Sequence, residues 1–200
     1  SLLSGLRARA GSRSEALEAI EEAIAEDPTQ AADWLSYANL LYEEGESSKA
    51  LDAADKCLEI DRQCGGAWAL TATILAPKQN RLKEALKAAI HAVALDSGGV
   101  DLVLLKADLL LADGQATAAE ESLVKSLEKD AMNGELRARI ATRYLLDGRP
   151  EDAQNLLDTT PVGIDHALLH VVEGRLHLVN ADKARAVSYT HLTLPTTGSV

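Results

Sequence analysis

Residues 34–58 hold the stretch that decides the fold, and they read WLSYANLLYEEGESSKALDAADKCL. After Gly45, the small residues Ala50, Ala54 and Cys57 follow one another at spacings of four and three, which places them on one face of a helix. Glycine tolerates the left-handed backbone that ends a helix, so Gly45 marks a turn between this helix and the amphipathic one before it. The stretch therefore predicts a helical hairpin whose two helices approach closely at small side chains.

The same pattern recurs along the chain with a period of 34 or 35 residues. Trp34 and Trp68 are 34 residues apart, and each predicted second helix carries an alanine in the same register. These alanines are Ala16, Ala50, Ala85, Ala119 and Ala153, and a glycine precedes four of them by five residues, at Gly11, Gly45, Gly114 and Gly148. Self-similarity at a fixed period is the signature of a repeat architecture, so the sequence predicts tandem hairpins.

The repeat resembles the tetratricopeptide repeat (TPR), a 34-residue helix-turn-helix unit. Its first-helix pattern is matched at Trp34, Tyr37, Ala38 and Leu41 and again at Trp68, Thr71, Ala72 and Leu75, and its second-helix pattern at Ala50, Ala54, Cys57 and Leu58. Two features depart from the family: its helix-ending proline is kept only at Pro28, and the turn over residues 76–83 holds one extra residue. The match covers about residues 1–160 and implies an all-α fold, an α-solenoid of tandem antiparallel helix-turn-helix repeats.

We expect hairpins near residues 11–33, 34–62, 68–96, 101–130 and 136–158, the first without a complete leading helix. A further helix near residues 165–180 would cap the solenoid. The chain begins at Ser1 without a methionine, and from Val187 the string VSYTHLTLPT resembles a translated sequencing-library adapter. These features predict a fragment, with a solenoid over residues 1–186 and a non-native tail over residues 187–200.

Composition argues against several classes of function. The net charge is −11, and fourteen acids against two bases lie between Glu15 and Asp61, so no basic stripe is present for a nucleic acid. No stretch approaches the roughly 18 consecutive apolar residues that a membrane-spanning helix needs. The two cysteines, Cys57 and Cys64, form no CxxC pair, which excludes a zinc ribbon or a thioredoxin-type motif and predicts two free thiols.

The one cluster of metal-ligand residues lies in the predicted C-terminal helix. His166, His170, Glu173 and His177 are spaced to share one stripe, and histidines at i and i+4 with a glutamate can bind Zn²⁺. The alternative is the polar outer face that the terminal unit of a solenoid needs, and apolar residues on the opposite face favour it. We therefore expect no metal and no cofactor, and no G-x-S-x-G, P-loop or H-E-x-x-H string indicates an enzyme.

The resemblance implies that first helices line a concave groove for a peptide or helix of another protein. The residues expected to bind this partner are Leu35, Asn39, Tyr42, Leu70, Thr73, Leu105 and Asp108. The residues that directly follow the first-helix positions equivalent to Trp34 are Leu35, Ala69, Leu104 and Ala138. None of them is basic, which argues against capture of a terminal carboxylate. Together with Leu111 and Leu146, the apolar members predict a groove suited to an amphipathic helix or an extended apolar peptide. The alternative for each leucine is packing between repeats.

Two function classes remain open at this point. The first is a protein-interaction scaffold in a larger assembly. The second is a regulatory or substrate-recruiting arm of a multidomain enzyme whose catalytic part lies outside this sequence. Because one fold serves many functions, the choice depends on the geometry of the site.

Overall fold

The computed structural model describes residues 2–95, 99–164 and 166–193, with side chains for residues 13–95, 99–164 and 166–182. All regular structure in these residues is helical, as the sequence predicts. The helices are α1 (Leu2–Glu26), α2 (Ala31–Glu43), α3 (Ser47–Ile60), α4 (Gly65–Leu75), the 3₁₀ turn η1 (Gln79–Arg81), α5 (Leu82–Ala94), α6 (Gly99–Ala112), α7 (Ala116–Lys129), α8 (Gly134–Leu146), α9 (Pro150–Asp158) and α10 (Ala167–Thr193). Among the described residues, no helix is long and apolar enough to cross a membrane.

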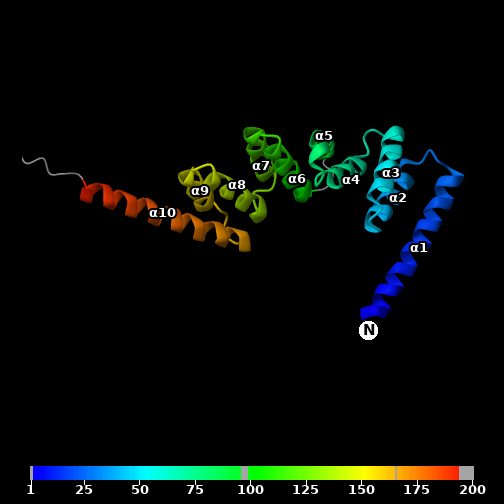
Figure 1. Cartoon of the computed structure of the whole chain (residues 1–200), viewed down its shortest axis with the longest axis horizontal. Helices are drawn as coiled ribbons and strands as arrows, with labels where there is room; N and C mark the ends of the chain where they lie inside the picture. Colours follow the sequence, from blue (N-terminus) through cyan, green and yellow to red (C-terminus); the bar gives the residue numbers. More distant parts are fainter. Residues whose placement is uncertain (1, 96–98, 165, 194–200) are drawn as a thin grey trace, which may run out of the picture. The chain divides into compact units, whose positions relative to one another are not determined.

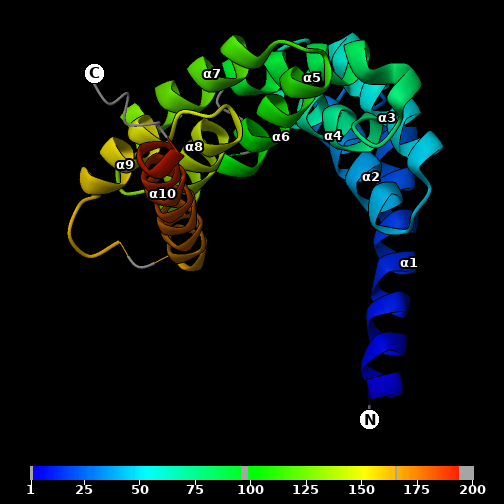
Figure 2. The same ribbon diagram turned by 60° about the vertical axis from the view of Figure 1, so that its left-hand side comes forward.

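The chain divides into two compact units, Ser1–Ala119 and Glu120–Val200, and the division falls inside α7. Within the first unit, α2 packs against α3 and α4 against α5 as hairpins, and within the second α8 packs against α9 (Figures 1 and 2). The hairpins predicted near residues 34–62, 68–96 and 136–158 are therefore present.

The turns inside the hairpins use glycine as the sequence predicts. Gly45, Gly114 and Gly148 have φ values of +83°, +78° and +71°, in the left-handed region where a side chain is strained. The backbone N–H of Gly45 donates to the carbonyl of Tyr42 at 3.0 Å, and that of Glu46 donates to the carbonyl of Leu41 at 2.9 Å. These bonds satisfy the carbonyls that the end of α2 would otherwise leave without partners.

Small side chains form the centre of the first unit. Each second helix presents three of them in the predicted register, and all six are fully buried: Ala50, Ala54 and Cys57 on α3, and Ala85, Ala89 and Ala92 on α5. Because these side chains extend only one heavy atom beyond the backbone in alanine and two in cysteine, facing helices pack at short interaxial distance. The repeat pattern is thus a packing pattern.

One side-chain hydrogen bond recurs at the start of the repeats. The indole Nε1 of Trp34 donates to the carbonyl of Pro28, and that of Trp68 donates to the carbonyl of Arg62, each at 2.9 Å and each six residues back. Arg137 occupies the same register in α8, and its Nη2 donates to the carbonyl of Ala131 at 3.3 Å. The bond ties a first helix to the turn that precedes it.

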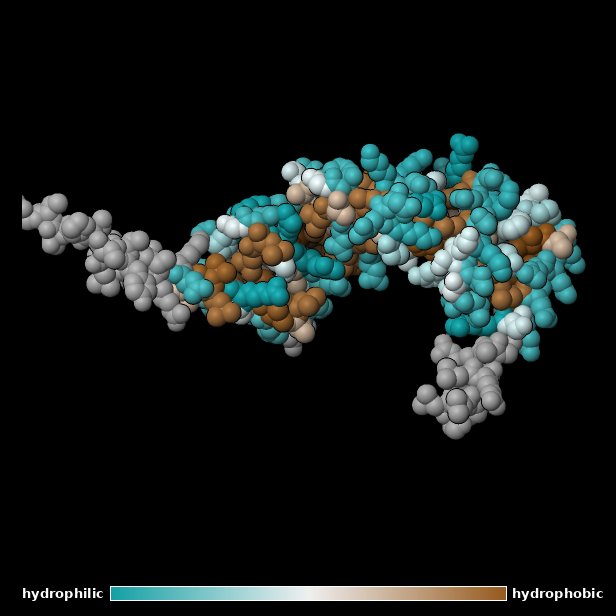
Figure 3. All heavy atoms as spheres, in the orientation of Figure 1, coloured by the Kyte–Doolittle hydropathy of each residue, from teal (hydrophilic) through white to brown (hydrophobic). Residues whose placement is uncertain are grey.

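The second unit has its own apolar core, shared by α8, α9 and the first half of α10. Its buried members are Ala138, Ala141, Ala153, Leu157, Leu169, Val172 and Leu176. The three from α10 follow helical spacing, so one face of that helix packs inward. Apolar residues also reach the surface of this unit near the start of α10, whereas polar residues dominate the visible surface of the first unit (Figure 3).

The prediction of a turn at Gly11 is wrong, because α1 runs unbroken from Leu2 to Glu26. Glycine permits the left-handed backbone but does not require it, and inside a helix it costs only about 1 kcal/mol relative to alanine. The turn at Gly45, by contrast, ends a complete helix of 13 residues that packs against its partner.

The C-terminal helix is longer than predicted. It was expected near residues 165–180, but α10 begins at Ala167 and extends to Thr193, into the predicted tail. No residue of α10 is a proline, so the backbone chemistry does not require the helix to end near residue 180. The packing of the tail concerns side chains that lie outside the described residues, so the tail over residues 187–200 stays a prediction.

Candidate functional site

An apolar hollow of about 410 Å³ lies between the α4–α5 connection and α6. Its lining residues are Ala76, Gln79, Leu82, Leu105, Asp108, Leu109 and Ala112. The α4–α5 connection differs from the other hairpin turns in two ways. It is one residue longer, as noted in the sequence, and it contains both Pro77 and the 3₁₀ turn η1. The longer connection places Gln79 and Leu82 opposite α6, which gives the hollow its second wall.

Two of the residues predicted to bind a partner meet in this hollow. Leu105 is half-buried on its apolar wall, and Asp108, one helical turn further along α6, is exposed at its edge. Leu82, Leu109 and Ala112 were not predicted. The signal that could have found them is the extra residue in the connection over residues 76–83, since a longer turn leaves room beside the next helix.

Leu70 is not on a surface, which corrects its prediction as a groove residue. Its side chain is 7% exposed and belongs to the core of the first unit. Although Leu70 and Leu105 occupy the same register in successive repeats, Leu70 lies in α4, which packs against α2 and α3 of the preceding hairpin as well as against α5. Packing between repeats, the alternative considered for each leucine, applies here.

The other predicted residues of the first unit lie on α2 and α4. Asn39 and Thr73 are exposed, although the Thr73 hydroxyl donates to the carbonyl of Ala69 in its own helix at 2.9 Å. Tyr42 is 39% exposed at the end of α2. Leu35 is half-buried over Gly66, where an added Cβ would lie 2.9 Å from its Cδ2 atom, so Leu35 contributes to packing between repeats.

Charged residues line a second hollow, of about 310 Å³, among α3, α4 and α5. Arg81 pairs there with Glu84, with 2.7 Å between Nη2 and Oε2. Burial raises the pKa of Asp55 above its ordinary value, and the nearby charge of Asp52 raises it further. Because its charges are paired or mutually repulsive, this hollow is a poor seat for an apolar peptide side chain.

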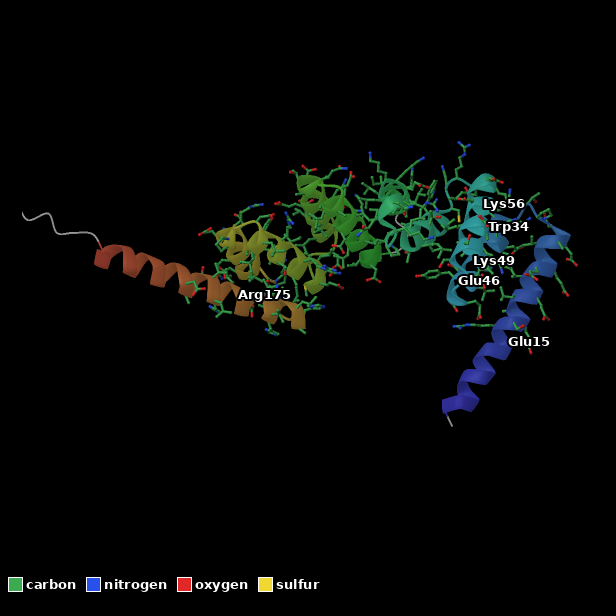
Figure 4. All side chains as sticks on the ribbon, in the orientation of Figure 1. Glu15, Trp34, Glu46, Lys49, Lys56 and Arg175 are labelled. Atoms are coloured by element: carbon green, nitrogen blue, oxygen red, sulfur yellow. The ribbon has the colours of Figure 1, made fainter. Side chains whose placement is uncertain are left out.

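The surface of the α2–α3 hairpin, whose helix α3 lines the second hollow, is polar. Figure 4 marks Trp34 on α2 and the pair Glu46 and Lys49 at the start of α3, whose Oε2 and Nζ atoms lie 3.5 Å apart. On α1, Glu21 accepts a hydrogen bond of 2.9 Å from the hydroxyl of Tyr37, and this bond raises the pKa of the tyrosine. The contact links α1 to α2.

The four weak metal candidates do not form a cluster. His166 precedes α10 and packs over Gly134, where an added Cβ would lie 2.7 Å from the His166 Cβ. His170 and Glu173 lie 3.4 Å apart between Nδ1 and Oε2, and His177 is exposed. Within the described part of the chain, no three His, Cys, Asp or Glu side chains are placed to hold a metal ion.

Comparison with solved structures identifies the fold. YrrB, described as a TPR protein with an unusual peptide-binding site, superposes with a TM-score of 0.68 at 23% identity, over 86% of this chain and 89% of that one. MamA gives 0.65 at 15% identity, over 84% and 93%. PilW, described as a widely conserved type IV pilus biogenesis factor, gives 0.63 at 20%, over 94% and 88%. No protein-family model matches the sequence, and no curated protein does. The all-α repeat fold is confirmed.

Proposed function

Because this chain has the tetratricopeptide-repeat fold, we propose that it is a non-catalytic protein-interaction scaffold that binds a peptide or an amphipathic helix of a partner protein. The observation that carries the proposal is the apolar hollow between the α4–α5 connection and α6. Ligand pockets in proteins are about 300–1,000 Å³, mostly apolar, with a few polar groups that fix orientation. At about 410 Å³, this hollow fits that description.

The chemistry of the hollow suits one apolar anchor side chain. Leu82, Leu105 and Leu109 offer aliphatic walls, and Gln79 and Asp108 supply polar groups beside them. A leucine-sized or aromatic side chain on a partner helix would be desolvated by the walls, while its neighbouring backbone or a basic residue would reach the polar groups. Interface energy usually concentrates in a few such buried anchors.

A ligand that continues across the repeats would meet exposed polar residues in register. Asn39 on α2, Thr73 on α4 and Asp108 on α6 are separated by 34 and 35 residues and are all exposed. Tyr42 adds an aromatic body with a polar tip at the end of α2. The peptide-binding site named for YrrB, on the same fold, supports a peptide as the ligand.

Charge favours a basic partner. Fourteen acids against two bases lie between Glu15 and Asp61, the segment that forms α2, α3 and most of the described side chains of α1. Such a field attracts cationic ligands and speeds their association at low salt. The proposed ligand is thus an amphipathic helix or peptide with an apolar face and a basic face.

The experiment is selection of a displayed library of amphipathic helical peptides against the full chain. Affinities of the selected peptides are then measured by fluorescence anisotropy for the chain and for Leu105→Ser. If Leu105 lines the anchor pocket, the variant should bind about 30-fold more weakly, which corresponds to about 2 kcal/mol for a lost anchor contact.

The matched control is Leu178→Ser, which removes a leucine that is 68% exposed on α10 and should leave affinity unchanged. Circular dichroism checks that both variants stay folded. Failure to select any peptide, or equal affinity for Leu105→Ser and the unchanged chain, would contradict the proposal.

A further inference from the structure

The connection between α3 and α4 brings the chain's two cysteines together. Cys57 lies in the last turns of α3 and is fully buried, whereas Cys64 directly precedes α4 and is partly exposed. The chain reverses between them: the N–H of Asp61 donates to the carbonyl of Cys57 at 2.8 Å, and the N–H of Cys64 donates to the carbonyl of Asp61 at 3.1 Å. The two thiols share a side-chain hydrogen bond across this turn.

We infer that Cys57 and Cys64 form a reversible disulfide, a redox modification site that clamps the joint between two successive repeats. The inference goes beyond the scaffold function and does not depend on it. Three observations carry it: the two side chains interact across the turn, Cys64 is partly exposed, and Cys57 is fully buried. A disulfide needs its two Cβ atoms close together, and a pair of thiols within hydrogen-bonding reach is near that geometry.

Exposure assigns the two sulfurs different parts in the oxidation. Burial, and then the hydrogen bond to Cys64, raises the pKa of the Cys57 thiol to about 12, so Cys57 is protonated and shielded at neutral pH. Cys64 is the sulfur that a solvent-borne oxidant can reach.

Hydrogen peroxide is the oxidant that the proposal names. The Cys64 thiolate attacks one peroxide oxygen, the O–O bond breaks, and Cys64 sulfenic acid and hydroxide form. The Cys57 sulfur then gives up its proton and attacks the Cys64 sulfur, expelling the sulfenic hydroxyl as hydroxide. Two thiols and one peroxide thus yield one disulfide and two waters. A dithiol reductant reverses the reaction by thiol–disulfide exchange.

The ring that this disulfide closes contains the anchor of a first helix. Arg62 lies between the two cysteines, and its carbonyl accepts the indole hydrogen bond of Trp68 at 2.9 Å. The oxidised ring limits the motion of this carbonyl and so holds α4 against the turn that precedes it. The consequence is a stiffer joint between the hairpin of α2 and α3 and the hairpin of α4 and α5.

Trypsin offers a direct test, because it cuts after Lys56, Arg62 and Lys78. The full chain is treated with hydrogen peroxide, its remaining thiols are blocked, and the digest is examined by mass spectrometry. The expected product is a disulfide joining residues 57–62 to residues 63–78, in monomeric protein, which disappears on treatment with dithiothreitol. Backbone amides of residues 57–68 should exchange hydrogen more slowly in the oxidised chain.

The variants Cys57→Ala and Cys64→Ser serve as controls. Alanine at position 57 matches Ala23 and Ala92 in the same register, so the first variant should fold. Both should lose the linked peptides and show the same amide exchange with and without peroxide. Sulfinic or sulfonic acid at Cys64 beside a free Cys57, a Cys64-linked dimer, or no reaction would overturn the proposed disulfide. A disulfide that leaves exchange in residues 57–68 unchanged would overturn the clamp.

Discussion

Replacing Leu75 with alanine tests whether the stability of each part of this fold depends mainly on its own repeat and the repeats next to it. Leu75 lies in α4, is 1% exposed and is among the largest fully buried side chains of the described residues. The change removes three carbon atoms, at about 0.8 kcal/mol for each buried methylene-sized group, or about 2.4 kcal/mol of transfer free energy. The cavity left behind adds to this, and leucine-to-alanine changes in cores cost about 2–5 kcal/mol.

The informative quantity is where this loss is felt. In repeat proteins each unit contacts only its neighbours, so stability is a sum of local contributions. Native-state hydrogen exchange should therefore show the opening free energy of α4 and α5 falling by about 2–5 kcal/mol, while amides of α9 and α10 change by less than about 0.5 kcal/mol.

The matched control is Leu146→Ala, which truncates a highly exposed leucine and should alter stability by no more than about 0.5 kcal/mol. Equal losses in α4 and α10 would refute the reasoning, because the chain would then unfold as one cooperative body. A loss below about 1 kcal/mol in α4 itself would mean that the site collapses around the smaller side chain.

Three further predictions concern turns, caps and charge. Gly148→Ala should destabilise the second unit by about 1 kcal/mol or more in urea unfolding, because φ is +71° at this position. Gly174→Ala should instead stabilise it by up to about 1 kcal/mol, because Gly174 is helical and has open space where a Cβ would lie. Free-energy changes of the same sign for both variants would contradict this. Asn133→Ala removes the side-chain oxygen that accepts from the Leu136 N–H at 3.0 Å and should cost about 0.5–2 kcal/mol, with Asn133→Asp as the control that keeps the cap. Asp55→Asn should stabilise the first unit at neutral pH, because the raised pKa of Asp55 means that the folded state disfavours its charge. The gain in stability should fade as the pH falls through that raised pKa, where the carboxyl of the folded state takes up its proton. A gain in stability that does not depend on pH would show that it does not come from the charge of Asp55.

The sequence predicted the hairpins well because the period-34 register is itself a packing rule. Ala50, Ala85 and their equivalents are small because a facing helix passes over them, and Gly45 and Gly148 adopt the backbone that ends a helix. A pattern imposed by close packing can be found in one sequence without knowledge of the rest of the fold. The turn at Gly11 was wrong because the same residue type carries no packing information on its own.

The candidate site was less predictable, because register gives a position on a helix but does not say what covers it. Leu70 and Leu105 are equivalent by count, yet the first is buried in the core and a hollow opens beside the second. The hollow depends on the course of the α4–α5 connection, which contains Pro77. Contacts within the fold determine this course, and the repeat register does not encode them. The contact between Cys57 and Cys64 likewise depends on how the chain reverses at Asp61.

The recurring hydrogen bond at the start of the repeats has an optical consequence. The chain has two tryptophans, and both lie in the first unit, while Arg137 takes the equivalent place in the second. Intrinsic fluorescence excited at the indole band therefore follows the first unit alone, whereas circular dichroism follows every helix. The unlabelled chain can therefore be followed by tryptophan fluorescence and by circular dichroism during one denaturation. Any gap between the two denaturation curves measures how independently the two units unfold.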